Sequence, residues 1–205
     1  MDATFSINAR YSASVAPTVR RYAAFAGLTN VLLPASTPLS PRADEQSLSS
    51  FLDSIAGFDD EDLASKVLRN RQLTSTRGGI RKAAATRHLA TILHDNGVDV
   101  LEDVPKLMSD LERVADVEGQ LNRVKGSGQM GVRTGYIWMT AGDDHMVKPD
   151  RHILRWIQTA IGRRPSVPES RGLLEVTAKQ LDVTPWVLDH AIWRHMSGRS
   201  VASAK

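Results

Sequence analysis

The sequence predicts an all-α protein, and three observations support this. Apolar residues recur at the three- and four-residue spacing of a helix in almost every segment. Glycine and proline signals that end and begin helices separate those segments. There is no convincing series of strands and no internal repeat. With 205 residues, 41% of them hydrophobic, the chain is long enough to bury a substantial core.

Residues 1–43 are expected to form an N-terminal extension with one helix. The helix covers Pro17 to Leu28, where apolar residues follow a helical spacing. The stretch "LLPASTPLSPRAD" follows it, and its three prolines and several serines predict a linker. Residues 44–205 are then expected to form one helical domain.

Three helices are expected in the first part of that domain. Asp44–Ile55 carries an apolar stripe and ends at Gly57. Asp59–Arg69 opens with four consecutive acids, which are favourable at the positive N-terminus of a helix. After the polar, basic loop "NRQLTSTRGG", a long helix covers about Ile80–His94 and stops at "NG".

The second part of the domain reads as helices separated by loops. A helix over Asp103–Val117 either runs on or restarts after Gly119. The stretch "LNRVKGSGQMGVRTGYIWM" then places glycines between two segments with helical spacing. Pro149 suits a first helical turn, and Thr184-Pro185 suits an N-cap followed by the first helical residue. The last three helices are expected over residues 149–161, 170–181 and 184–195.

Charge is segregated along the chain, although the net charge is only +3. Residues 63–94 hold seven lysines and arginines and no acid, whereas residues 95–118 hold eight acids and only two basic residues. Residues 119–139 are basic again, without any acid. Such segregation is typical of a protein with one basic and one acidic surface, and equally of solvated helix faces that happen to differ in sign.

Composition excludes several classes of protein. Without cysteine there is no disulfide, no Cys-ligated zinc site and no Cys-ligated iron–sulfur cluster. The sequence contains no run of eighteen apolar residues, so no membrane span is predicted. The stretch "MDATFSINAR" lacks the apolar segment of a secretory signal. The expected location is the cytoplasm.

The turn around Gly126-Ser127-Gly128 is the first candidate binding element. Glycine lets a ligand approach the main chain closely, and amides at a helix N-terminus favour an anion. Arg123, Lys125 and Gln129 lie beside these glycines, so a DNA phosphate is the natural ligand. The alternative is a tight turn between two packed helices that binds nothing.

Two patterns together carry a family resemblance. The first is Leu-x-x-Val-x-Gly-x-Gly from Leu121. The second, some twenty residues beyond it, is "VKPDRHILRW", which contains Val147, Asp150, His152 and Arg155. The first resembles the helix-hairpin-helix motif. Together they resemble the HhH-GPD superfamily of DNA glycosylases, relatives of endonuclease III, with the hairpin at about residues 117–139.

The resemblance implies that Asp150 is the catalytic carboxylate of base excision. A carboxylate near the sugar stabilises the positive charge that develops as the glycosidic bond breaks. Some members carry a Schiff-base lysine where this chain has Met130, so a monofunctional enzyme without lyase activity is expected. The alternative for Asp150 is a plain helix-capping acid.

Further site residues follow from the same resemblance. Hairpin residues Lys125, Gly126, Ser127, Gly128 and Gln129 would hold a DNA phosphate. The carbonyls of Val124 and Gly126 would hold a Na or K ion. Gln72 would act as a wedge in the duplex, and Arg71, Arg77 and Arg123 would contact DNA. Met130, Tyr136 and His152 would line the base pocket. The expected partner is double-stranded DNA, bound by a monomer associated with the nucleoid, with no membrane partner.

Two other functions remain open. A non-catalytic helix-hairpin-helix protein would bind DNA structure or damage and use Asp150 only as a cap. Alternatively, residues 176–196 resemble the helix-turn-helix of a DNA-binding regulator. Its recognition helix would carry Trp186, Asp189, His190 and Trp193, although two tryptophans and an acid suit burial better than base reading.

Overall fold

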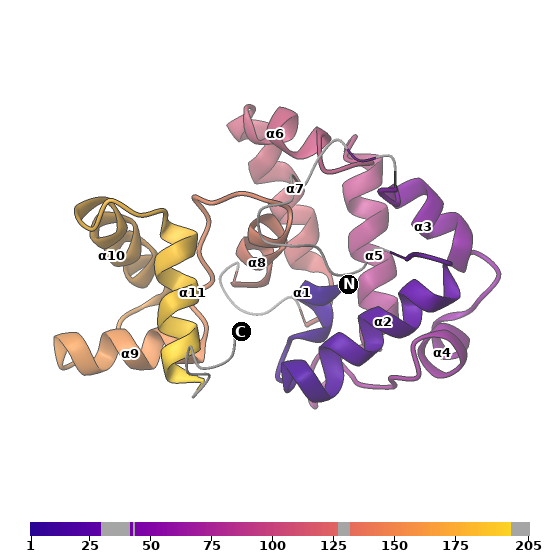
Figure 1. The fold of residues 1–205 in the computed structure, drawn as a ribbon, viewed down its shortest axis with the longest axis horizontal. Helices are drawn as coiled ribbons and strands as arrows, with labels where there is room; N and C mark the ends of the chain where they lie inside the picture. Colours follow the sequence, from indigo (N-terminus) through magenta and orange to yellow (C-terminus); the bar gives the residue numbers. More distant parts are fainter. Residues whose placement is uncertain (30–41, 43, 127–131, 198–205) are drawn as a thin grey trace. The chain divides into compact units, whose positions relative to one another are not determined.

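The computed structural model describes residues 1–29, 42, 44–126 and 132–197. Within these ranges the chain forms α-helices and two short π-helical segments, and the sole β feature is an isolated bridge between Leu73 and Arg81 (Figure 1). The all-α class is therefore confirmed. No helix of the described part is long and apolar enough to cross a membrane.

The chain divides into two compact units, Met1–Ser127 and Gly128–Lys205. The sequence placed a division elsewhere, after residue 43. The N-terminal helices instead pack into the core of unit 1, because Phe5, Val15 and Tyr22 are buried with apolar residues of later helices. Side chains of residues 1–29 therefore complete the core of unit 1, and these residues are not an extension.

Unit 1 contains nine helical elements among its described residues. Their bounds are α1 Asp2–Phe5, η1 Tyr11–Val15, α2 Ala16–Phe25, α3 Leu48–Ile55, α4 Asp60–Asp62, η2 Leu63–Val67, α5 Lys82–Asp95, α6 Asp103–Met108 and α7 Leu111–Arg123. The two segments written η are the π-helical ones.

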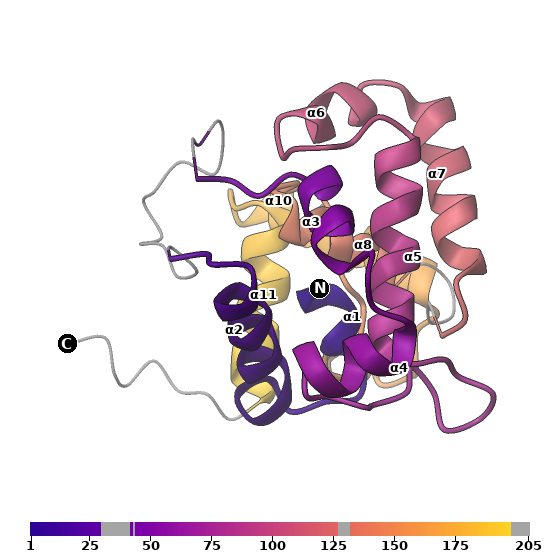
Figure 2. The same ribbon diagram turned by 90° about the vertical axis from the view of Figure 1, so that its right-hand side faces the viewer.

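Helix α5 is central to unit 1 and lies between α3 and α7 (Figures 1 and 2). Its alanines Ala83, Ala84, Ala85 and Ala90 are buried, and their small side chains allow neighbouring helices to approach closely. Larger apolar side chains fill the space around them. The main cluster consists of Phe5, Val15, Tyr22, Phe51, Ile55, Leu63, Ala64, Val67, Leu68, Ala83 and Ala90.

A buried lysine fastens the N-terminal segment to α5. Lys82 is only 2% exposed, and its ammonium group donates to the carbonyls of Phe5 at 3.0 Å and Ile7 at 2.6 Å. It also donates to Oε1 of Gln72 at 2.9 Å. Because an ammonium has three donors, these acceptors match its full capacity and compensate for its removal from water.

The acidic region 95–118 forms two helices, where the sequence predicted one. Helix α6 ends at Met108. Asp110 is the N-cap of α7 and accepts a hydrogen bond from the amide of Arg113 at 3.1 Å. An N-cap aspartate satisfies an otherwise unpaired amide, which favours a new helix start over a continuous helix. Gly119 lies inside α7, so no restart occurs there.

Unit 2 contains four helices among its described residues: α8 Val132–Thr140, α9 Arg151–Ile161, α10 Val167–Gln180 and α11 Pro185–Met196. They bury a separate cluster of Val147, Ile153, Ile157, Leu174 and Ile192. Helix α10 begins three residues earlier than expected, because Ser166 and Glu169 form a capping box. Gly162 ends α9 in the left-handed conformation, with φ of 74°.

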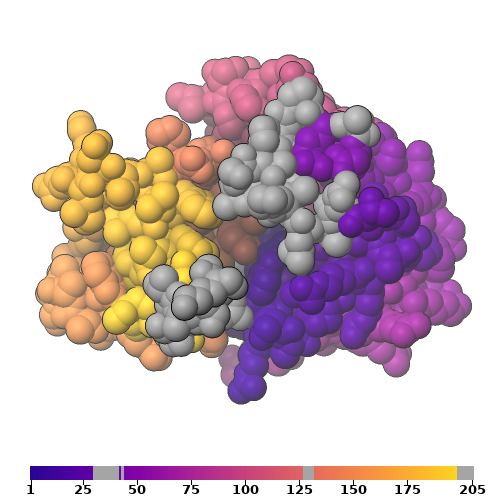
Figure 3. Space-filling view, in the orientation of Figure 1, coloured from indigo at the N-terminus to yellow at the C-terminus, as the bar shows by residue number. Residues whose placement is uncertain are grey.

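Helices α10 and α11 form the yellow surface in Figure 3 and expose several apolar side chains. These are Leu173, Val176, Leu181, Val183 and Val187. Scattered exposed apolar residues are common on folded proteins, and nothing about these indicates what covers them.

Candidate functional site

Asp150 is the N-cap residue of α9, at the helix start where the sequence placed it. Its Oδ1 accepts hydrogen bonds from the amides of His152 at 2.8 Å and Ile153 at 3.3 Å. Both bonds fall on one oxygen, so within the described chain Oδ2 accepts none. The capping role is therefore present, and it leaves the second oxygen for a ligand or a water molecule.

Asp189 of α11 is a second carboxyl group beside the same segment. It is 3% exposed, and its Oδ2 accepts a hydrogen bond from the amide of Lys148 at 2.9 Å. Burial raises the pKa of Asp189 to about 7, the hydrogen bond and charge of Lys148 oppose this, and the charge of Asp150 adds to the rise. A buried acid that titrates near neutral pH is a mark of a functional site.

Sequence reasoning placed Asp189 in a recognition helix and missed its relation to Asp150. Its spacing contained a signal, because Asp189 precedes the buried Ile192 by three residues and so belongs to the inward face of α11. An acid on an apolar helix face needs a partner within the protein. The amide of Lys148, two residues before Asp150, is that partner.

Unit 2 also holds two sets of aromatic contacts, one of them with Lys148. The ammonium of Lys148 lies 3.5 Å from the ring centroid of Tyr136, a cation–π contact. The ring of His190 stacks between those of Trp186 and Trp193, at centroid distances of 5.2 and 5.9 Å. Burial lowers the pKa of His190, and the charges of Arg194 and Lys148 lower it further.

The structure describes two of the three predicted pocket residues. Tyr136 is half-buried against Lys148, and His152 is half-buried in the first turn of α9. Met130 lies outside the described residues. Trp138 is fully buried and belongs to the interior. The pocket assignment stays a prediction.

The hairpin is described only at its beginning. Gly126 has φ of 83°, and a Cβ added to it would lie 2.2 Å from Cβ of Thr74. The hydroxyl of Thr74 donates to the carbonyl of Lys125 at 3.0 Å. Unit 1 therefore fixes the entry to the hairpin, and only glycine fits at position 126.

The remaining hairpin assignments stay predictions. Ser127, Gly128 and Gln129, whose amides are predicted to bind a phosphate, lie outside the described residues. Val124 is buried and Arg123 and Lys125 are exposed. The structure says nothing of an ion at the carbonyls of Val124 and Gly126.

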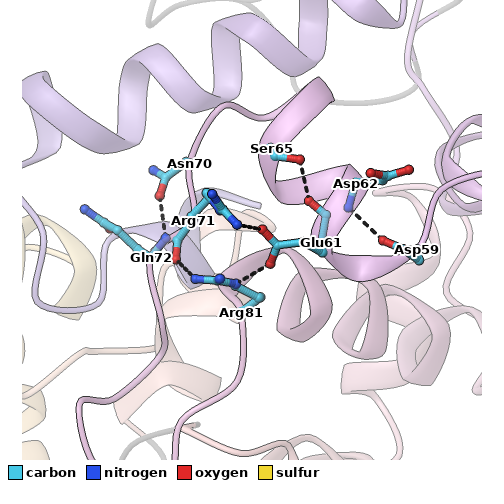
Figure 4. A network of polar contacts seen from close by, with 8 residues as sticks. All are labelled: Asp59, Glu61, Asp62, Ser65, Asn70, Arg71, Gln72 and Arg81. Atoms are coloured by element: carbon cyan, nitrogen blue, oxygen red, sulfur yellow. Dashed lines mark hydrogen bonds and ion pairs between the residues drawn. The ribbon is translucent and has the colours of Figure 1, made fainter.

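The predicted wedge and its neighbours belong to a polar network in unit 1. Figure 4 shows Arg71 and Arg81 converging on the carboxylate of Glu61, with Arg81 at 2.8 Å. Burial alone would raise the pKa of Glu61, but hydrogen bonds from Arg81 and Arg71 and their charges lower it. Oε1 of Gln72 accepts a hydrogen bond from Lys82, which holds the Gln72 side chain in place although Gln72 is exposed.

The basic run 63–94 is largely neutralised by the acids that open α4. Lys66 pairs with Asp62 at 2.7 Å, and Arg87 pairs with Asp60 at 3.3 Å. Arg71 and Arg81 pair with Glu61, and Lys82 is buried. Of the seven basic residues, this leaves Arg69 and Arg77 to contact a ligand. The run therefore contributes less to a basic surface than its composition indicates.

The predicted site residues fall in different units. Asp150, Tyr136 and His152 belong to unit 2, whereas Arg71, Gln72, Arg77, Arg123, Lys125 and Gly126 belong to unit 1. Within unit 1, Thr74 joins the loop that carries Gln72 to the hairpin entry. Within unit 2, the segment Lys148–Asp150 joins α8, α9 and α11 through its contacts with Tyr136, His152 and Asp189.

Comparison with known proteins yields one family. A family model described as Domain of unknown function (DUF8548) matches residues 1–197 and so spans both units. No curated protein and no solved structure matches the chain.

Proposed function

We propose that this chain, which belongs to the DUF8548 family, is a monofunctional DNA base-excision glycosylase that uses Asp150 as its catalytic carboxylate. One observation carries the proposal. The carboxylate of Asp150 is oriented by two amides through Oδ1 while Oδ2 accepts no hydrogen bond from the described residues, and a second, buried acid lies beside the same segment. The resemblance of the sequence from Leu121 to Ile157 to the HhH-GPD superfamily supports it.

The chemistry requires little more than this carboxylate. When the glycosidic C–N bond breaks, its electron pair leaves with the base and positive charge develops on the sugar. Oδ2 of Asp150 would stabilise that charge and accept a proton from the water that adds to the sugar carbon. The amides of His152 and Ile153 hold Oδ1 of this carboxylate and so orient it for that role.

The absence of a lysine at position 130 predicts that the reaction stops after base release. A Schiff base with the sugar needs an amine, and the thioether of Met130 cannot form one. The expected product is an intact strand that contains an abasic site. The target base must leave the duplex stack to be reached.

The test is a base-release assay with labelled duplexes that contain uracil, hypoxanthine, alkylated purines, oxidised guanine or mismatched adenine. We expect breaks that appear only after hot alkali with the wild-type protein. Asp150→Asn should lower the rate by at least about a hundredfold while duplex binding is retained. Asp182→Asn is the matched control, since Asp182 is exposed in unit 2 and has φ of 54°, where asparagine is well accommodated.

Other outcomes would contradict the proposal in distinct ways. Breaks without alkali would show a lyase and a nucleophile other than Met130. Binding to every duplex without base release would indicate a non-catalytic DNA-structure binder. Protection of one sequence would indicate a regulator, although burial removes Asp189 from the residues that α11 could offer to base edges.

A further inference from the structure

Arg133, in the first turn of α8, has a buried guanidinium. It is 4% exposed. Its Nε, Nη1 and Nη2 are all inaccessible to solvent, and none of them has a hydrogen-bond partner among the described residues. Arginine is rarely buried in this way unless a carboxylate, phosphate or carbonyl accepts its donors.

The charge of Arg133 makes this arrangement costly. Burial lowers the pKa of Arg133 to about 10, so the guanidinium is still charged at neutral pH. A buried charge without a counter-ion destabilises the protein that contains it. An oxyanion that bound there would recover this cost and would find five donors in a planar fork.

The surroundings of α8 also favour an anion. Arg171 of α10 has a buried Nε without a partner in the described part of the chain, and its Nη2 lies 3.9 Å from the position of a Cβ on Gly135. Residues 119–139 contain no acid that could pair locally with Arg133. The first turn of α8 contributes the positive end of a helix dipole.

We propose that Arg133 is the receptor for a phosphate-type oxyanion in unit 2. A guanidinium can donate two parallel hydrogen bonds to two oxygens of one phosphate, which gives it both affinity and orientation. The phosphate can belong to the backbone of DNA or to a small phosphorylated compound. The DNA source rests on the proposed function, whereas the anion site itself does not.

The experiment compares the full-length wild type with Arg133→Met, Arg133→Lys and Arg164→Met. Arg164 is exposed in unit 2, so its variant makes the same charge change away from the site. Binding of inorganic pyrophosphate is measured by calorimetry. Binding of an undamaged 20-base-pair duplex is measured by fluorescence anisotropy at several salt concentrations. Thermal unfolding of each protein is recorded without ligand.

If Arg133 binds the phosphate of DNA, Arg133→Met weakens duplex binding about tenfold or more and lowers the salt slope by about one. Arg133→Lys should fall between the two, because it keeps the charge and loses the fork. If the source is a small compound, pyrophosphate binding is lost in Arg133→Met while duplex binding matches that of Arg164→Met. Either result supports the site.

Two results would overturn it. In the first, both ligands bind Arg133→Met as they bind Arg164→Met. In the second, Arg133→Met unfolds at a much lower temperature than the wild type, which would show a structural partner for the guanidinium. The proposal expects an unchanged or higher unfolding temperature, because an unpaired buried charge has been removed. Base release is read separately through Asp150, so the failure of catalysis and of this site are distinguishable.

Discussion

Asp150 and Asp189 carry the same carboxyl group in two different environments. Asp150 is half-buried, and the amides of His152 and Ile153 hold one of its carboxylate oxygens at the start of α9. Asp189 is buried in α11 with one amide donor, and burial raises its pKa to about 7. Burial keeps Asp189 protonated up to a higher pH than an exposed aspartate, so it can act as a neutral hydrogen-bonding group.

We expect Asp189 to make stability depend on pH. Its pKa is about 7 in the folded protein and near the ordinary 3.8 in the unfolded chain, so the folded state holds the proton more tightly. Its ionisation therefore costs nothing below about pH 4, and the cost grows as the pH rises to about 7. By then the free energy of unfolding should have fallen by on the order of 4 kcal/mol.

Urea unfolding of the wild type and Asp189→Asn between pH 4 and 8 measures this cost. The asparagine oxygen can still accept from the amide of Lys148, so the difference between the two proteins isolates the charge. The wild type should lose stability relative to the variant as the pH rises. In the Asp150→Asn background the total loss should be smaller, since removing the charge of Asp150 lowers the pKa of Asp189 and makes its ionisation cheaper. A pH-independent difference would contradict the buried, proton-binding state of Asp189.

The free energy of unfolding falls over the pH interval between the unfolded and the folded pKa of Asp189, and a lower folded pKa makes that interval narrower. The interval starts at the same unfolded pKa and ends sooner, so the total loss is smaller. A smaller total loss in the Asp150→Asn background is therefore the decisive observation, and an equal loss would show that the two carboxyl groups do not interact.

At the scale of elements, helix starts were predicted well where a capping residue stands next to a clear apolar pattern. Asp59 and Thr184 cap α4 and α11 as the sequence indicated. The break before Asp110 and the early start at Ser166 were missed, because the apolar spacing continues through the first and is weak in the second. In both places a local side-chain bond to a backbone amide decided the boundary.

The loop before α5 and the hairpin entry act as one structural element. Thr74 receives the amide of Ile80 on its hydroxyl oxygen at 3.2 Å and donates to the carbonyl of Lys125. Gly126 lies against the same side chain. The glycine pattern predicted a tight turn, but the partner of that turn is some fifty residues away in sequence. Periodicity cannot reveal such a pairing.

We expect Gly126→Ala to lower the free energy of unfolding by about 2 to 4 kcal/mol. The new methyl group would overlap Thr74, and alanine resists a φ of 83°. Gly119→Ala is the control, because Gly119 lies in α7 with no atom within 4 Å of its added Cβ, so alanine should stabilise the helix slightly. Urea unfolding midpoints measure both. Equal midpoints for Gly126→Ala and the wild type would mean that Gly126 does not lie against Thr74.

At the scale of the whole molecule, the two units have separate cores and different spectroscopic reporters. All four tryptophans, Trp138, Trp156, Trp186 and Trp193, belong to unit 2. Unit 1 has nine of the thirteen described helical elements. Tryptophan fluorescence therefore follows unit 2, whereas far-ultraviolet circular dichroism follows mostly unit 1.

We expect Lys82→Met to destabilise unit 1 selectively. The variant leaves the carbonyls of Phe5 and Ile7 without their donor, at a cost of about 2 to 4 kcal/mol. The midpoint of thermal unfolding by circular dichroism should fall, while the midpoint by tryptophan fluorescence stays where it is. Lys179→Met, in α10 of unit 2, is the control and should shift neither appreciably, since Lys179 is exposed. A parallel fall of both midpoints for Lys82→Met would show that the units unfold together.

The division into units was not predictable from composition. The proline-rich stretch after Leu28 indicated a boundary, because linkers are rich in proline and serine. Yet Phe5, Val15 and Tyr22 complete the core beneath α3 and α5, and a sequence pattern does not show which distant helix an apolar stripe covers. The helical class follows from local spacing, whereas the assignment of stripes to cores depends on contacts across the chain.

The bonds of Lys82 also set an order of events during synthesis. Phe5 and Ile7 precede their partner by 77 and 75 residues, which a ribosome adds in roughly 4 to 15 seconds. During that interval the buried face of α1 and the bulky side chains of α2 have no core to join. The nascent chain must keep this apolar N-terminal segment from associating with other molecules until α5 emerges, so the first helix made cannot complete its packing before Lys82 has been added.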